Sequence, residues 1–158
     1  MSNPKGQTSL VGAPAPGWVV DLKSAGDQTF ASGALGAGVA VIPESREVAA
    51  PVSGTVVAAF PTGHAFGIAS EDGVEVLVHI GVDTVKLKGE HFTALAVEGQ
   101  RLRQGDPLAR VDFAAVGQAG YQTAVIVAVT NTADFAAVEP LGLGDCVARG
   151  APILRVTR

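Results

Sequence analysis

The sequence feature that most restricts the fold is the regular interruption of short Val-rich runs by glycine and proline. Twenty Gly and nine Pro are spread along 158 residues, and no long stretch repeats apolar residues at helical spacing. Runs of about four to eight such residues between turn residues are typical of β-strands. The pattern therefore predicts an all-β protein with many short strands and tight turns. The expected strands span 17–22, 38–42, 55–60, 74–80, 107–113 and 122–131, and 90–96 is expected to form a helical turn.

Two internal repeats support a duplicated strand motif. Residues 11–20 (VGAPAPGWVV) align with residues 48–57 (VAAPVSGTVV). Residues 99–111 (GQRLRQGDPLARV) align with residues 144–156 (GDCVARGAPILRV). Each segment reads as a strand, a turn with Gly or Pro, and a second strand. Two copies of each unit predict a sandwich or a barrel with internal pseudo-symmetry, with Cys146 in a strand and facing the core.

Length and composition define the class of protein. A chain of 158 residues suits one domain, so we expect a flexible N-terminal tail over 1–10 and a single domain over 11–158. The start of the sequence lacks the apolar run of a signal peptide, and one Cys forms no internal disulfide. We therefore expect a cytoplasmic protein without direct membrane insertion. A net charge of −4 with only 11 Lys and Arg argues against a nucleic-acid partner.

Two of the three histidines are candidates for a functional site. Alternation along 73–81 (GVEVLVHIG) places its four aliphatic residues at 74, 76, 78 and 80 on the core face. Glu75, Leu77 and His79 share the outer face. His64 follows the strand at 55–60, so pairing of the two strands in one sheet would bring both imidazoles to the same surface.

Imidazole offers two chemistries at such a surface. Two His with a third ligand hold a metal ion. Alternatively, neutral imidazole carries a lone pair on one nitrogen that attacks phosphorus, and its unperturbed pKa of about 6.5 leaves it mostly neutral at cytoplasmic pH. The residues by themselves do not choose between metal and phosphate.

Four segments in order resemble one bacterial family. They are VAAPVSGTVV, TGHAFGI, GVEVLVHIGVDTVKLKGEHF and VEGQRLRQGDPL. The chain is similar, from about residue 11 to residue 156, to the glucose-type enzyme IIA of the phosphoenolpyruvate-dependent sugar phosphotransferase system. The resemblance implies an all-β fold, an antiparallel β-sandwich with a duplicated strand motif and short helical turns. It also implies a histidine phosphocarrier that accepts a phosphoryl group from phospho-HPr and passes it to a cysteine of a IIB sugar-permease domain.

The resemblance also implies roles for individual residues. It makes His79 the phosphorylated residue, with Nε2 as the acceptor atom. His64 contacts the phosphoryl group, Thr62 orients the His64 ring, and the carbonyl of Gly81 holds the Nδ1 proton of His79. No cofactor or metal is implied.

A partner-binding surface is implied around these residues. The family presents an apolar rim, with carboxylates outside it that meet arginines of HPr. The corresponding residues in this chain are Phe30, Leu35, Phe60, Leu77 and Val85 for the rim, and Asp27 and Asp83 for the carboxylates. Gly63, Gly67 and Leu77 depart from the family pattern, which often has larger polar residues at the two glycines and an aromatic residue at position 77.

Two alternative functions are a zinc-dependent hydrolase and a purely regulatory binding module. Some zinc-dependent hydrolases share a related β-rich core, but they need an H-x-H pair, and the residue two before His79 is Leu77. A purely regulatory binding module is the other alternative, and regulation could coexist with carrier function. We expect a monomer, because the partners must reach the site in turn. The sequence does not identify the transported sugar.

Overall fold

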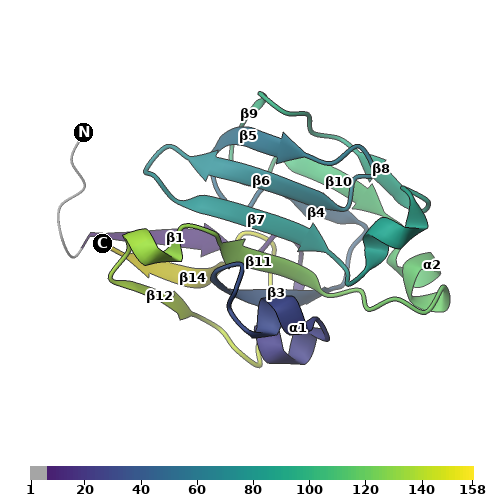
Figure 1. The fold of residues 1–158 in the computed structure, drawn as a ribbon, viewed down its shortest axis with the longest axis horizontal. Coiled ribbons are helices and arrows are strands. Elements are labelled where there is room, and N and C mark those ends of the chain that lie inside the picture. The colour runs from purple at the N-terminus through teal and green to yellow at the C-terminus, as the bar shows by residue number, and fades with distance from the viewer. Residues whose placement is uncertain (1–6) are drawn as a thin grey trace.

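The computed structural model describes residues 7–158 as a β-sandwich (Figure 1). Within those residues, one antiparallel sheet has eight strands and two smaller antiparallel sheets have three each. The large sheet, in spatial order, contains β13 (Cys146–Val147), β2 (Gly17–Asp21), β3 (Ala37–Pro43), β11 (Val125–Val129), β7 (Glu75–Ile80), β6 (Ala65–Ser70), β5 (Gly54–Ala59) and β9 (Arg101–Leu102).

The smaller sheets form the other side of the core. One contains β1 (Thr8–Gly12), β14 (Pro152–Thr157) and β12 (Ala137–Pro140), and the other contains β4 (Glu47–Ala49), β10 (Pro107–Val111) and β8 (Phe92–Ala94). Fully buried residues such as Phe66 of the large sheet and Leu108 and Leu154 of the smaller sheets belong to one hydrophobic cluster. In Figure 1, β5, β6 and β7 lie in front of β4 and β10.

Helical segments are short and lie in the connections between strands. They are the α-helices α1 (Gln28–Ala31) and α2 (Phe113–Gln118), and the 3-10 turns η1 (Leu22–Ala25), η2 (Thr84–Leu87) and η3 (Thr132–Asp134). No helix in residues 7–158 has the length and apolar character needed to cross a membrane. The prediction of an all-β sandwich with short helical turns is confirmed.

The two sequence repeats correspond to pairs of strands. The first repeat contributes β1 with β2 and β4 with β5, and the second contributes β9 with β10 and β13 with β14. Each copy of the first repeat pairs with a copy of the second. In the small sheets, β1 pairs with β14 and β4 pairs with β10. In the large sheet, β2 pairs with β13 and β5 pairs with β9. The duplicated unit therefore builds both edges of the large sheet and leaves β6, β7, β11 and β3 in its middle.

Three sequence-based expectations differ from the structure. Residues 1–6 of the expected tail lie outside the described part, but Thr8, Ser9 and Leu10 belong to β1, because they pair with Thr157, Val156 and Arg155. The expected helical turn at 90–96 contains β8, which pairs with β10. Cys146 is in a strand but exposed, because β13 is a two-residue edge strand that pairs with Trp18, itself 48% exposed.

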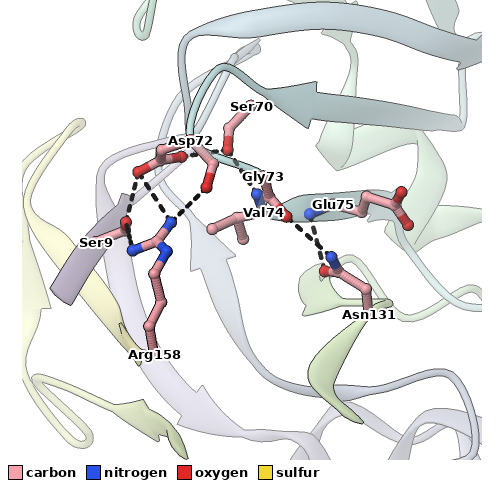
Figure 2. A network of polar contacts seen from close by, with 8 residues as sticks. All are labelled: Ser9, Ser70, Asp72, Gly73, Val74, Glu75, Asn131 and Arg158. Carbon is pink, nitrogen blue, oxygen red and sulfur yellow. Dashed lines mark hydrogen bonds and ion pairs between the residues drawn. The ribbon is translucent and has the colours of Figure 1, made fainter. Parts of the chain in front are cut away.

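A polar cluster joins the terminal strands to the turn between β6 and β7 (Figure 2). The Arg158 side chain is only 7% exposed; its Nη1 donates to Ser9 Oγ at 2.8 Å and its Nη2 lies 3.5 Å from an Asp72 carboxylate oxygen. Ser9 and Ser70 both donate to that carboxylate. Burial acts to raise the pKa of Asp72, but the two hydroxyls and the Arg158 charge outweigh it and hold that pKa below its ordinary value.

We predict that Asp72→Asn lowers the free energy of unfolding by about 1–2 kcal/mol at neutral pH, because it removes charged hydrogen bonds from a buried guanidinium. Because the pKa of Asp72 is lowered on folding, its carboxylate contributes its full stabilisation of the folded state above pH 3.8, the ordinary pKa of the group. This stabilisation is lost as the pH falls through the pKa of the folded state. Urea denaturation should therefore show the difference between wild type and variant shrinking at acid pH. Glu139→Gln, which breaks the half-exposed ion pair with Arg155, should cost less than about 0.5 kcal/mol. Equal costs for the two variants would contradict the role of the cluster.

Candidate functional site

Pairing of β6 with β7 brings the two candidate histidines together. Ala65, the residue after His64, is directly opposite His79 in the register of these strands. The Ile80 amide donates to the His64 carbonyl at 2.7 Å, which extends the pairing by one step. The two imidazole rings lie 5.4 Å apart between centroids and are nearly perpendicular, at 83°.

The His79 ring is held by a backbone carbonyl. Its Nδ1 lies 2.7 Å from the Gly81 oxygen. A carbonyl oxygen only accepts, so Nδ1 carries the hydrogen, and in the neutral ring the lone pair is on Nε2. The half-buried ring therefore presents an unprotonated Nε2.

The position of that carbonyl depends on the conformation of Gly81. Its φ of 77° is in the left-handed region, where glycine is favoured. A Cβ there would collide with the Thr84 side chain and lie 2.9 Å from the Gln122 oxygen. The Gly81 amide donates to the Ala124 carbonyl at 2.8 Å. The turn is thus fixed on both sides of the carbonyl.

The His64 ring is buried and oriented by two neighbours. The residue is 3% exposed. Its Nδ1 is in very short contact with Thr62 Oγ1, and the Phe60 ring packs edge-on against it at 5.2 Å between centroids. The Nε2 of His64 has no hydrogen-bond partner within residues 7–158, so it is free to meet a ligand beside His79.

Burial keeps both rings neutral. Burial is the main cause that lowers the pKa of His79; it outweighs the Gly81 hydrogen bond and the charges of Asp27 and Asp83, which act to raise that pKa. Burial also lowers the pKa of His64, and the neighbouring His79 adds to the effect. Both imidazoles are therefore unprotonated at neutral pH.

Segments on either side of β7 complete the surroundings of His79. The Asp27 carboxylate accepts from the Thr29 and Phe30 amides at the start of α1. Phe30 is 3% exposed and packs against the His79 ring at 5.2 Å, so it forms a wall beside the ring rather than an exposed part of the rim. Asp83 precedes η2 with a φ of 60°, and its charge acts on His79.

The other expected rim residues are apolar and reach solvent to different degrees. Phe60 is 47% exposed, Val85 51% and Leu35 39%, while Leu77 is half-buried. Leu77 lies two residues before His79 on the same face of β7, and Phe60 contacts His64.

Thr84 is a site residue that the sequence reasoning missed. It is 1% exposed, and its hydroxyl donates to the Ile80 carbonyl at 2.5 Å. Its methyl group occupies the space into which a side chain at position 81 would project. The D-T-V segment at 83–85 was the sequence signal that could have indicated Thr84. Its positioning role depends on contacts with Ile80 and Gly81 across a turn, which alternation along a strand does not reveal.

The described residues hold no group of three or more His, Cys, Asp or Glu placed to bind a metal ion. His64 and His79 therefore lack a third ligand of this kind within residues 7–158. The arrangement offers one unprotonated ring nitrogen beside a second imidazole, which suits nucleophilic attack assisted by a hydrogen-bond donor.

We predict that both rings titrate below the ordinary histidine pKa of 6.5, because burial penalises their charged forms. At pH 7, nitrogen NMR should find His79 neutral with its hydrogen on Nδ1. A His79 ring protonated on Nε2 at that pH would contradict the geometry. Because both pKa values are lowered, the rings cost no stability above about pH 6.5, and they destabilise the folded chain as pH falls below it.

Comparison with known proteins matches this fold and sequence to one family. The family model of the phosphoenolpyruvate-dependent sugar phosphotransferase system, EIIA 1, covers residues 9–135. A solved structure of glucose permease IIA from Mycoplasma capricolum superimposes with a TM-score of 0.85 and 36% identity, covering 94% of this chain and 96% of that one.

Curated relatives carry the same unit within longer proteins. The PTS system beta-glucoside-specific EIIBCA component of Dickeya chrysanthemi is 42% identical over 91% of this chain and 23% of its own length. The PTS system glucose-specific EIICBA component of Streptococcus pneumoniae is 44% identical over 93% of this chain and 20% of its own length. The chain thus spans less than a quarter of the length of these relatives, and it belongs to the EIIA 1 family of the phosphoenolpyruvate-dependent sugar phosphotransferase system.

Proposed function

We propose that His79 is the phosphoryl-carrying residue of this chain. The family is a phosphotransferase-system component that transfers phosphoryl groups. The observation that carries the assignment is the 2.7 Å contact between His79 Nδ1 and the Gly81 carbonyl, which leaves the lone pair on Nε2. In this proposal Nε2 accepts the group from phospho-HPr and passes it to a cysteine of a IIB sugar-permease domain.

The transfer exchanges one bond to phosphorus for another. The Nε2 lone pair forms the N–P bond while the bond from phosphorus to the donor atom breaks, and its electron pair leaves with the donor. In the second step a cysteine thiolate of the IIB domain attacks phosphorus, and the N–P electron pair returns to Nε2. The ring is cationic while it carries the phosphoryl group, and the Gly81 carbonyl dipole stabilises the hydrogen retained on Nδ1.

His64 acts as a hydrogen-bond donor to the phosphoryl oxygens. With the Thr62 hydroxyl donating to Nδ1, the neutral His64 ring has its hydrogen on Nε2, the free nitrogen near His79. Placing such a donor where charge develops is a large contribution to catalysis of phosphoryl transfer. Thr62 and Gly81 are positioning residues in this scheme.

The surrounding surface is proposed to receive both partner proteins in turn. An apolar rim excludes water from the labile N–P bond, and carboxylates outside it steer a basic partner surface and fix its orientation. The residues proposed for this surface are Asp27, Leu35, Phe60, Leu77, Asp83 and Val85, and Phe30 supports it from below as the buried wall beside His79.

The cellular location and the sugar system are proposed from the partner proteins. We propose that the chain works as a monomer in the cytoplasm, where a IIB domain would present its cysteine. Two relatives are named as beta-glucoside-specific and glucose-specific components, so IIB domains of both kinds are candidates for acceptance of the phosphoryl group. Reconstitution with each candidate IIB domain identifies the sugar system served.

Labelling tests the acceptor residue. Incubation with phosphoenolpyruvate, enzyme I and HPr should add one acid-labile phosphoryl group per chain, and His79→Ala should abolish it because Nε2 is the nucleophile. His91→Ala is the matched control, since it removes the histidine outside the site, and it should be labelled like wild type. Normal labelling of His79→Ala would refute the assignment.

Single-turnover kinetics test the second imidazole. His64→Gln should still accept a phosphoryl group, because the His79 nucleophile is intact. Onward transfer to a IIB domain should slow by about 10²–10³-fold, the loss typical of one donor to developing charge. Thr62→Val should give a smaller loss of the same kind. Transfer by His64→Gln at the wild-type rate would show that His64 has no such role.

A further inference from the structure

We infer that a hollow beside His79, which we call the Gly67 hollow, binds one long basic side chain of the IIB domain during transfer, and this inference rests on the proposed function. The hollow has a volume of about 250 Å³ and lies on the outer face of the large sheet. Its lining residues are Val57, Gly67, Ile68, Ala69, Glu75, Val76, Leu77 and Thr130.

The hollow exists because a glycine lies between two larger side chains. Gly67 of β6 is opposite Leu77 of β7 and Ala58 of β5. The register of β5 shifts between Val56 and Ala58, and Val57 at this irregularity is 51% exposed. A Cβ at Gly67 would lie 3.4 Å from the Ala58 Cβ and 3.6 Å from Val57, in ordinary contact. A Cβ at position 67 therefore fits beside these neighbours, and no positive φ opposes a side chain there.

A single carboxylate lies at one end of the hollow. Glu75 is exposed and shares the outer face of β7 with Leu77 and His79. Its carboxylate makes no hydrogen bond or ion pair within residues 7–158, and Figure 2 shows it directed away from the Arg158 cluster. No Lys, Arg or His lines the hollow, so the negative charge is not compensated locally.

The backbone beneath this carboxylate is firmly held. The Glu75 amide donates to Asn131 Oδ1 at 3.0 Å, and its carbonyl accepts from the Thr130 amide at 2.9 Å. Asn131 Nδ2 also donates to the Gly73 carbonyl at 2.9 Å (Figure 2). The carboxylate is therefore presented from a fixed point at the start of β7.

This combination matches an arginine or lysine side chain. The apolar floor and walls at Gly67, Val57 and Leu77 suit an aliphatic stem, and Glu75 at the end suits its cationic head. A charge-assisted hydrogen bond to a carboxylate then fixes the orientation of the side chain. A purely apolar side chain would leave Glu75 without a partner.

The hollow is close enough to His79 to be covered by the same partner. Glu75 and His79 are four residues apart on one strand, which corresponds to about 13 Å at about 3.3 Å per residue. A standard interface buries about 800 Å² per partner, a disc of about 16 Å radius. We assign the occupant to a IIB domain because the relatives are named EIIBCA and EIICBA components, in which the A unit belongs to the same protein as a B unit.

The test measures transfer from phosphorylated chain to the IIB domain that wild type serves best in the reconstitution. Gly67→Leu fills the hollow and Glu75→Gln removes its charge while preserving shape. Each should raise KM for the IIB domain about tenfold with kcat unchanged, as expected for loss of a binding contact outside the reacting atoms. Glu75→Gln should also reduce the salt dependence of kcat/KM. Because both changes remove the same contact, the double variant should lose less than the product of the two effects.

Glu98→Gln is the matched control, an exposed glutamate outside the hollow, and its KM should equal that of wild type. A thermal melt and an NMR spectrum of Gly67→Leu confirm that it folds. An unchanged KM for the IIB domain in both hollow variants would overturn the inference. An increase in KM for phospho-HPr alone would also overturn it, because HPr would then be the occupant of the hollow. Neither result affects the proposed function. That function would fail in a separate measurement, if the wild-type chain accepted no phosphoryl group.

Discussion

The hydrogen bond from His79 Nδ1 to the Gly81 carbonyl is the interaction on which the proposed chemistry depends. It places the ring hydrogen on one nitrogen and the lone pair on the other, and it does so through backbone rather than a second titratable group. The carbonyl is held in place by the left-handed conformation of Gly81 and by the packing of Thr84 beside it. A change at either position would act on the proposed nucleophile, His79, without altering that residue itself.

The duplicated strand unit explains why the site lies where it does. Crosswise pairing of the repeats builds the two edges of the large sheet, and the strands that carry the site lie in its middle. There β7 is paired on both sides, by β6 and β11, so the position of His79 is fixed by two hydrogen-bonded ladders. The same pairing sets Gly67 opposite Leu77, which produces the hollow next to the imidazoles.

Apolar packing and acidic charge have opposing effects at this surface. Burial lowers the pKa of both rings and keeps them neutral, while Asp27 and Asp83 act to raise that of His79 and favour its charged form. Such a balance suits a ring that is neutral before it accepts a phosphoryl group and cationic while it carries one. Glu75 extends the acidic character along β7 to the far side of Leu77.

Local periodicity and turn residues are sufficient to predict the all-β class, the main strands, the duplication and the alternation that puts His79 on the outer face. The family resemblance adds expected roles for His64, Thr62 and Gly81. Strand pairing and packing, in contrast, are properties of the folded chain: they bring the imidazoles together, bury Phe30 as a wall, leave Cys146 exposed and set Thr84 against the Gly81 turn. These features depend on contacts between residues far apart in the chain or across a tight turn, and no local pattern encodes such contacts.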